Sequence, residues 1–116
     1  MLAKINRFHG HNSLSSVYRK GQSVSLSQIS LKYIPIKSDK KYKLAVVVSR
    51  KVDKSAVVRN RIRRRLYESI RQKYPKFKQN ANIIITVHNR QLATMKTSEL
   101  DDLIQQLLIK SSLLEQ

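Results

Sequence analysis

Cysteine is absent from this sequence, and its absence excludes three kinds of chemistry. The 116 residues cannot form a disulfide framework, a thiolate nucleophile or a cysteine-based zinc site. The absence also fits a reducing compartment. The chain is long enough for one domain with one core, and its apolar content of 41% is typical of a folded chain.

Long hydrophobic runs are absent as well. No apolar stretch approaches about 20 residues, the length that a helix needs to cross a bilayer. The first ten residues, MLAKINRFHG, lack the apolar core of a signal peptide. We therefore expect a cytoplasmic protein without a membrane partner.

Acidic residues are scarce: seven Asp and Glu stand against 24 Lys and Arg, which gives a net charge of +17. The imbalance is concentrated in residues 1–98, which carry +20, whereas residues 99–116 carry −3. Such a charge opposes compaction, so we expect a polyanion as the usual partner. Nucleic acid is the leading candidate, because neutralising its phosphates releases counterions. An anionic membrane surface and a merely solubilising charge are the alternatives.

The few acids also bear on catalysis. Proteins that hydrolyse phosphodiesters usually cluster carboxylates around metal ions or use a histidine acid–base pair. Asp39 and Asp53 lie in separate predicted loops, and four other acids lie in the last predicted helix or its tail. His9 and His11 form an HxH pair with no obvious third ligand. We therefore expect no catalytic side chain and no metal site in the chain itself.

The apolar patterns follow the order α-β-β-α-β-α, which predicts a single small α/β (α+β) domain, a two-layer sandwich of helices packed on one sheet. Residues 1–11 have no apolar periodicity and are predicted to be a flexible basic arm, followed by one domain at residues 12–116. A short helix is expected around Leu14 and Tyr18, with Gly21 as its C-terminal stop.

The predicted strands differ in pattern. Residues 22–34 alternate like one strand, and their parity changes near Ser27 and Gln28, which predicts a bulge at that point. Residues 43–49, KLAVVVS, are continuously apolar and are therefore predicted to be a central strand that is covered on both faces. Residues 82–88, NIIITVH, are predicted to be a second buried strand.

Two longer helices are expected. One covers residues 55–74, and the other begins at a cap on Thr97 or Ser98, with acids in its first turn where they suit the helix dipole. The apolar stripe of the last helix consists of Leu100, Leu103, Ile104, Leu107 and Leu108.

The helix at 55–74 contains RNRIRRR and has two sides. Its apolar stripe, which should face the sheet, consists of Val58, Ile62, Leu66 and Ile70. Most of the basic side chains fall on the opposite side. Arg65 lies at a margin of the stripe, and Arg59 lies inside it, close enough to the helix start to pass the sheet edge and border a binding surface. Arginine forks bind phosphate bidentately, and Asn60 can bond both phosphate and a ribose hydroxyl.

At RNRIRR the sequence resembles the protein subunit of bacterial ribonuclease P. The motif lies within VVVSRKVDKSAVVRNRIRRRLYESIR, residues 46–71, where a strand leads to the helix through a basic connector, residues 50–54. The stretches NRF, LSSVYRKGQSV, III-T (residues 83–86) and SELDDLIQQLL resemble other parts of the family, so the resemblance covers nearly the whole chain. It implies the family's left-handed βαβ crossover, although connections of this kind are generally right-handed.

The resemblance implies a subunit of an endoribonuclease that removes the 5′ leader of precursor tRNA by magnesium-dependent hydrolysis. A large partner RNA would carry the catalysis and bind most of the magnesium. The expected partners are that catalytic RNA, one per protein, and precursor tRNA. A ribosomal or general RNA-binding protein without a nuclease role is the main alternative, and it would not need a second surface for the leader.

The resemblance also assigns residues. The catalytic RNA would be bound by Arg59, Asn60, Arg61, Arg63, Arg64, Arg65, Lys51 and Lys54. The leader would be bound in a cleft between the first helix and the sheet by Leu14, Tyr18, Arg19 and Tyr33. Aromatic rings can stack on splayed bases, but Tyr18 and Tyr33 suit ordinary core packing equally well. Leu14 stands where the family often has phenylalanine, and Arg90 follows the last strand only after His88 and Asn89, which leaves its part in binding open.

Overall fold

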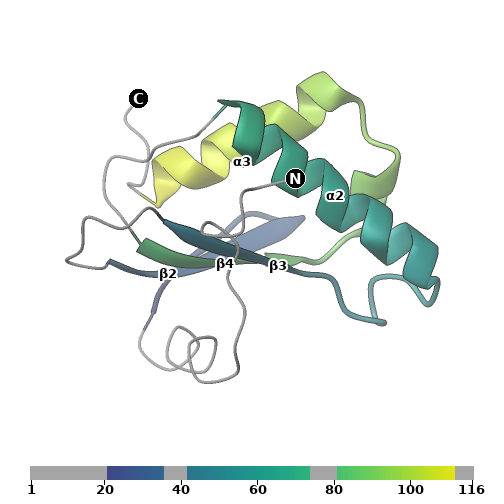
Figure 1. Ribbon diagram of the computed structural model, residues 1–116, viewed down its shortest axis with the longest axis horizontal. Coiled ribbons are helices and arrows are strands. Elements are labelled where there is room, and N and C mark those ends of the chain that lie inside the picture. The colour runs from purple at the N-terminus through teal and green to yellow at the C-terminus, as the bar shows by residue number, and fades with distance from the viewer. Residues whose placement is uncertain (1–20, 36–41, 74–80, 112–116) are drawn as a thin grey trace.

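The computed structural model describes residues 21–35, 42–73 and 81–111, and it shows two helices lying over one face of a four-stranded sheet (Figure 1). The predicted arm at 1–11 and the predicted helix around Leu14 and Tyr18 lie outside the described residues. The elements are β1 (Gln22–Ser25), β2 (Ile29–Pro35), β3 (Lys43–Val47), α2 (Ala56–Lys73), β4 (Ala81–Val87), the 3-10 turn η2 (Arg90–Ala93) and α3 (Thr97–Lys110).

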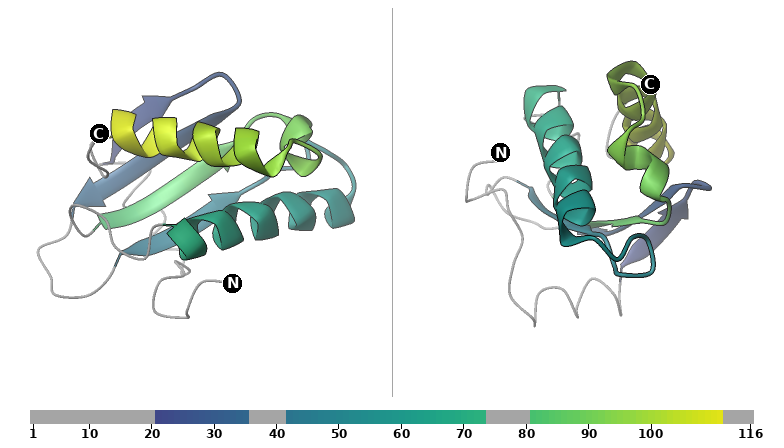
Figure 2. Two further views of the ribbon diagram at one scale, coloured as in Figure 1. Left: turned by 90° about the horizontal axis from the view of Figure 1, so that it is seen from above. Right: turned by 90° about the vertical axis from the view of Figure 1, so that its right-hand side faces the viewer.

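The strand order is β1-β2-β4-β3, so β4 lies inside the sheet, antiparallel to β2 and parallel to β3. The helix α2 connects the two parallel strands. Seen from the helix side with these strands pointing up, β4 lies to the left of β3, which makes the crossover left-handed (Figure 2). The resemblance therefore predicted the handedness of this crossover correctly, whereas the general preference for right-handed crossovers would have predicted it wrongly.

The predicted single strand at 22–34 is wrong. β1 and β2 form an antiparallel hairpin, in which Ser25 pairs with Ser30 and the N–H of Leu26 donates to the carbonyl of Ile29 at 2.8 Å. The change of parity was placed correctly at Ser27 and Gln28, but those two residues form a tight turn and not a bulge. A bulge and a two-residue turn both shift the inward-facing residues by one position, so alternation alone cannot separate them.

The prediction of a central strand at 43–49 is also wrong in part. β3 is buried, but it lies at the edge of the described sheet. Its outer edge contacts α2, where the hydroxyl of Tyr67 accepts a hydrogen bond from the N–H of Val46 at 3.1 Å. A side chain thereby satisfies one backbone donor of an edge strand.

The two helices build one core against the sheet. The stripe of α2 is confirmed, since Ile62, Leu66 and Ile70 are fully buried and Val58 packs against them. The buried residues of α3 are Leu100, Ile104, Leu107 and Leu108. The cap of α3 differs from the prediction: the N-cap position is Lys96, which makes no side-chain capping bond.

The opposite face of the sheet, which we call the open face, has a mixed character. Ala45 and Ile84 are buried there, and Ile34 and Val47 pack partly against them. The strand register places a polar set on the same face, next to this apolar patch. This polar set consists of Ser30, Lys32, Lys43, Asn82 and Thr86.

Candidate nucleic-acid interface

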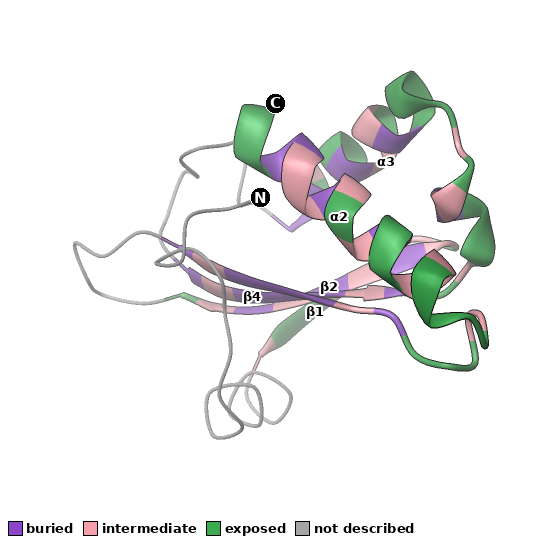
Figure 3. Cartoon of the chain, turned by 45° about the vertical axis from the view of Figure 1, so that its right-hand side comes forward, coloured by how far each residue is buried: buried purple, intermediate pink, exposed green. Residues whose placement is uncertain are grey.

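The outer face of α2 consists of Val57, Asn60, Arg61 and Arg64, all exposed to solvent. It lies opposite the buried stripe, because residues one and two turns apart share a side of a helix. Much of the start of α2 and of the preceding connector is exposed in Figure 3. No acid lies in the first turn of α2, so its positive dipole end adds to the charge of these arginines.

Arg64 separates two shallow grooves on this face, each of about 340 Å³. One groove is lined by Arg61, Arg64, Arg65 and Glu68. The other is lined by Asn60, Arg63, Arg64 and Tyr67, and there the guanidinium of Arg63 donates to the amide oxygen of Asn60. Guanidinium groups on both sides of a helix ridge suit a ligand with many phosphates.

The far end of α2 carries ion pairs. Arg71 bonds the carboxylate of Glu68 at 2.9 Å, and this bond lowers the pKa of Glu68 to about 2. Lys73 reaches Asp101 of α3 at 2.7 Å, and Ser69 donates to the same carboxylate at 2.6 Å. Partial burial raises the pKa of Asp101, but Lys73 and Ser69 outweigh it and hold the pKa below its ordinary value.

Two of the predicted RNA-binding arginines bond to the protein's own backbone. Arg59 donates to the carbonyls of Asp53 and Lys54 at 3.0 and 2.9 Å, and so fixes the connector to the first turns of α2. Arg65 donates to the carbonyls of Leu92 and Met95, which ties η2 to the helix. Both therefore have a structural part, which explains why they lie inside and beside the apolar stripe.

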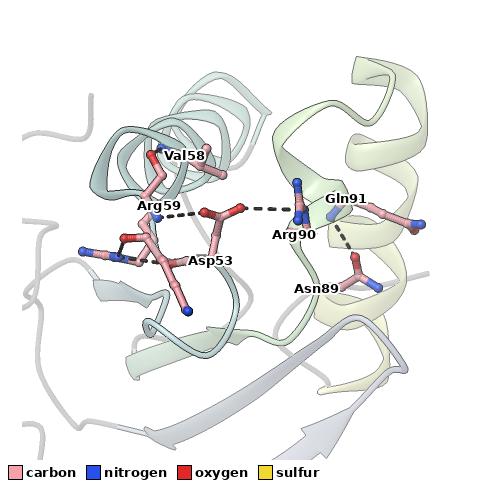
Figure 4. A network of polar contacts seen from close by, with 8 residues as sticks. Asp53, Val58, Arg59, Asn89, Arg90 and Gln91 are labelled. Carbon is pink, nitrogen blue, oxygen red and sulfur yellow. Dashed lines mark hydrogen bonds and ion pairs between the residues drawn. The ribbon is translucent and has the colours of Figure 1, made fainter.

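The connector forms a further cationic surface. A hollow of about 440 Å³, which we call the connector hollow, is lined by Arg50, Lys51, Val52, Asp53, Lys54 and Arg90. The carboxylate of Asp53 accepts the N–H of Ser55 at 2.8 Å and pairs with Nε of Arg90 at 3.7 Å (Figure 4). Two segments far apart in the sequence thus meet here.

Tyr33 does not line an open surface. Only 6% of it is exposed, and it belongs to the core between the sheet and the helices, with its hydroxyl bonded to Gln22 at 2.9 Å. Of the two roles considered for Tyr33, the structure therefore favours core packing. Its neighbour Lys32 points to the open face instead, because side chains alternate along a strand. Leu14, Tyr18 and Arg19 lie outside the described residues.

Sequence reasoning missed Asp53 and Lys32 as parts of these surfaces, and it left the part of Arg90 open. For Lys32 the signal was present, since a lysine between Leu31 and Tyr33 marks the wetter side of a strand. No local signal could join Asp53 to Arg90, because their contact depends on how the connector and η2 are placed by the fold.

In residues 21–35, 42–73 and 81–111, no three side chains of His, Asp or Glu are grouped so as to hold a metal ion. Within the same ranges, no helix is both long and apolar enough to cross a membrane.

The fold and the outer face of α2 together define a small α/β protein with a polycationic helix, and comparison with known proteins gives the family. The family model for ribonuclease P matches residues 2–112. The ribonuclease P protein component of Pseudanabaena is 32% identical over 114 residues, which cover 98% of this chain and 97% of the relative. That of Rippkaea orientalis is 34% identical over 91 residues, covering 74% and 71%. The chain belongs to the ribonuclease P protein family.

Solved structures agree in fold. The RNase P protein of Staphylococcus aureus superposes with a TM-score of 0.82 at 22% identity, covering 95% of this chain and 98% of that one. The RNase P protein of Thermotoga maritima gives a TM-score of 0.77 at 17% identity, covering 88% and 94%. As a ribonuclease P protein component, the chain is part of a tRNA-processing endoribonuclease with an RNA partner. The alternative of a ribosomal or general RNA-binding protein is therefore set aside.

Proposed function

We propose that the chain binds the ribonuclease P RNA through the outer face of α2 and the connector, and so assists removal of the 5′ leader from precursor tRNA. The observation that carries the proposal is the two-sidedness of α2. Ile62, Leu66 and Ile70 of its inner stripe are fully buried, whereas Arg61 and Arg64 remain exposed and form no hydrogen bond or ion pair with the other residues that the structure describes. The fold needs the stripe but not these two charges, which suit RNA phosphates.

Catalysis is proposed to lie with the RNA. The described carboxylates on this side of the molecule already have partners: Asp53 pairs with Arg90, Glu68 with Arg71, and Asp101 with Lys73. They therefore do not fit a magnesium site, which needs several oxygen ligands on one ion. In this proposal the RNA holds the magnesium and the protein supplies binding energy and charge neutralisation.

The leader is proposed to bind on the open face of the sheet, opposite the helices. The half-buried side chains of Ile34 and Val47, which pack against the buried Ala45 and Ile84, adjoin polar residues there, including Lys32 and Thr86. A surface that combines apolar contacts with positive charge suits a single strand, whose bases are exposed and whose phosphates are charged. Tyr18, Arg19 and Leu14 remain predicted contributors from outside the described residues. One protein per RNA and a cytoplasmic location complete the proposal.

The test is a reconstitution of the full chain with the ribonuclease P RNA of the same organism and a precursor tRNA. At low magnesium we expect cleavage to be much faster with the protein than without it, because its cations replace part of the ionic screening that the RNA needs. Unchanged cleavage would contradict the proposal.

A second arm locates the leader surface. Lys32→Ala should reduce the preference for precursor over mature tRNA about threefold to tenfold, since one phosphate contact is lost. Tyr33→Phe is the matched control on the neighbouring residue, because it keeps the core ring and removes only the hydroxyl. A larger loss of preference in Tyr33→Phe than in Lys32→Ala would place the leader elsewhere.

A further inference from the structure

The two grooves beside Arg64 have equal volumes of about 340 Å³ but different walls. One of them, which we call the Tyr67 groove, is lined by Asn60, Arg63, Arg64 and Tyr67. These four residues lie on one side of α2, because their spacings of three and four residues are close to whole helical turns. The other groove contains Glu68, and none of its described residues is aromatic. Of the two, the Tyr67 groove alone offers a flat ring beside its cations.

The ring of Tyr67 is held in place from the side of the sheet. Its hydroxyl accepts a hydrogen bond from the N–H of Val46 in β3 at 3.1 Å, and its side chain packs partly against the core. The residue is only half-buried, so the rest of the ring lines the groove. A ring that is already fixed loses little conformational entropy when a second flat group stacks on it.

The other walls of the Tyr67 groove also suit a flat ligand. The guanidinium of Arg63 donates to the amide oxygen of Asn60, which leaves the amide nitrogen of Asn60 to donate to a ligand. The planar heads and aliphatic stems of arginines pack well on aromatic faces. A nucleobase has such a face, and its edges carry hydrogen-bond acceptors. A phosphate has no flat face, so the ring of Tyr67 would add nothing to its binding.

We propose that the Tyr67 groove binds one unpaired nucleobase of the ribonuclease P RNA, which stacks on the ring of Tyr67 and accepts a hydrogen bond from Asn60. A base inside a duplex has its faces against its neighbours, so this site requires a loop, a bulge or a strand end. The groove shares Arg64 with the outer face of α2, and we therefore assign the base to the ribonuclease P RNA and not to precursor tRNA. The inference rests on the proposed function and adds a ligand class to it, since the proposed function itself requires only phosphates.

The first experiment measures the affinity of full-length variants for the ribonuclease P RNA at several salt concentrations. Tyr67→Leu should bind about tenfold more weakly, because the stacking of a base on an aromatic ring is lost. Its salt dependence should keep the wild-type value, because no phosphate contact is removed. Arg64→Met provides the contrast, since it should lose affinity together with about one released ion. Unchanged affinity of Tyr67→Leu, or a fall in its salt dependence as large as that of Arg64→Met, would overturn the assignment of a base.

Tyr67→Phe separates stacking from the bond to β3. It keeps the ring and removes the hydroxyl that accepts the N–H of Val46. Stacking predicts that Tyr67→Phe binds within about threefold of wild type and so restores most of the affinity that Tyr67→Leu loses. Gln105→Leu, at an exposed position of α3, is the control for a surface leucine and should bind as the wild type does. Equal losses in Tyr67→Phe and Tyr67→Leu would show that Tyr67 acts through β3 and not on a base.

A second measurement does not depend on a loss of affinity or on the stability of Tyr67→Leu. The sequence contains no tryptophan, so Tyr67→Trp places a single indole in the groove. Stacking on a nucleobase quenches indole fluorescence, and the ribonuclease P RNA should therefore quench this variant, whereas Gln105→Trp should keep its fluorescence. A fully paired RNA duplex should bind Tyr67→Trp through phosphates without quenching it. Equal quenching by the duplex and by the ribonuclease P RNA, or none by either, would overturn the proposal.

The same measurements separate a wrong ligand from a wrong function. Quenching of Tyr67→Trp by precursor tRNA alone, with none by the ribonuclease P RNA, would overturn the choice of ligand. If the wild-type chain did not bind the ribonuclease P RNA at all, the proposed function itself would be wrong. If the wild-type chain bound that RNA and Tyr67→Leu bound it equally well, the proposed function would stand and the nucleobase site would be wrong.

Discussion

The helices α2 and α3 perform the same task on their inner sides and carry opposite charges on their outer sides. Both bury an aliphatic stripe in one core, and Ile62 of α2 and Ile104 of α3 are each fully buried. Over their whole lengths, α2 has seven basic residues and one acid, whereas α3 has three acids and one lysine. Packing therefore accounts for the inner stripes but not for the outer charge, which has to be explained by a partner.

The largest expected effect tests whether the buried stripes of α2 and α3 contribute equally to stability. Ile62→Ala and Ile104→Ala remove the same atoms from equally buried positions, so each should lower the free energy of unfolding by about 2–5 kcal/mol. Urea denaturation of both variants at one salt concentration gives the comparison. If Ile62→Ala cost far less than Ile104→Ala, α2 would not be packed as the structure has it.

The next effect tests whether the outer side of α2, and not that of α3, binds RNA. Replacing Arg61 and Arg64 together by Ala should weaken binding of the ribonuclease P RNA about 100-fold, or about tenfold for each charged contact. The salt dependence should fall by about two released ions. The control changes the outer side of α3, with Glu99→Gln and Asp102→Asn together, and should leave affinity within about threefold of wild type. Similar losses in both variants would remove the distinction between the helices.

A smaller effect separates two neighbouring arginines of α2. Arg65→Met leaves the carbonyls of Leu92 and Met95 without their donors, so it should lower the free energy of unfolding by about 1–3 kcal/mol. Arg64→Met, on the exposed face, should change it by less than about 0.5 kcal/mol and should weaken RNA binding instead. Equal stability of the two variants would show that Arg65 does not hold η2 in place.

The smallest effect lies where the two helices meet. Asp101 of α3 bonds Ser69 and Lys73 of α2, and its pKa is held below the ordinary value of 3.8. A carboxyl whose pKa is lowered by folding stabilises the protein above about pH 4 and loses this contribution as the pH falls through the folded pKa. Asp101→Asn should therefore be less stable at pH 7 by under about 1 kcal/mol, with a smaller difference at pH 3. Urea denaturation at both pH values measures this, and a difference that stayed constant would contradict the assignment.

Local patterns predicted α2 and α3 well. The bounds of α2 and α3 follow from apolar stripes that a helix of 3.6 residues per turn turns into one face, and the structure confirms Ile62, Leu66 and Ile70 as that face of α2. The strand β4 was predicted in the same way, from a short run of continuously apolar residues.

The remaining errors share a physical cause. A change of parity at Ser27 is compatible with a bulge or a turn, and only the pairing of β1 with β2 decides. β3 has the apolar run of a central strand because Ala45 and Val46 are buried on opposite faces, while its edge is covered by Tyr67. The backbone bonds of Arg65 and the pair of Asp53 with Arg90 depend on tertiary packing, which cannot be predicted from a short stretch of sequence.

The most direct test asks whether the outer face of α2 lies against the ribonuclease P RNA. Because the sequence contains no cysteine, a single cysteine can be introduced at a chosen position. Val57 lies on the outer face of α2 and is 75% exposed, and Val57→Cys leaves every cation in place. Gln105→Cys is the matching substitution at an exposed position of α3. An iron chelate on each thiol would cut nearby RNA with hydroxyl radicals in the assembled complex. We predict specific cuts in the ribonuclease P RNA from position 57 and none from position 105. Cuts from position 105 alone, or none from either, would contradict the account.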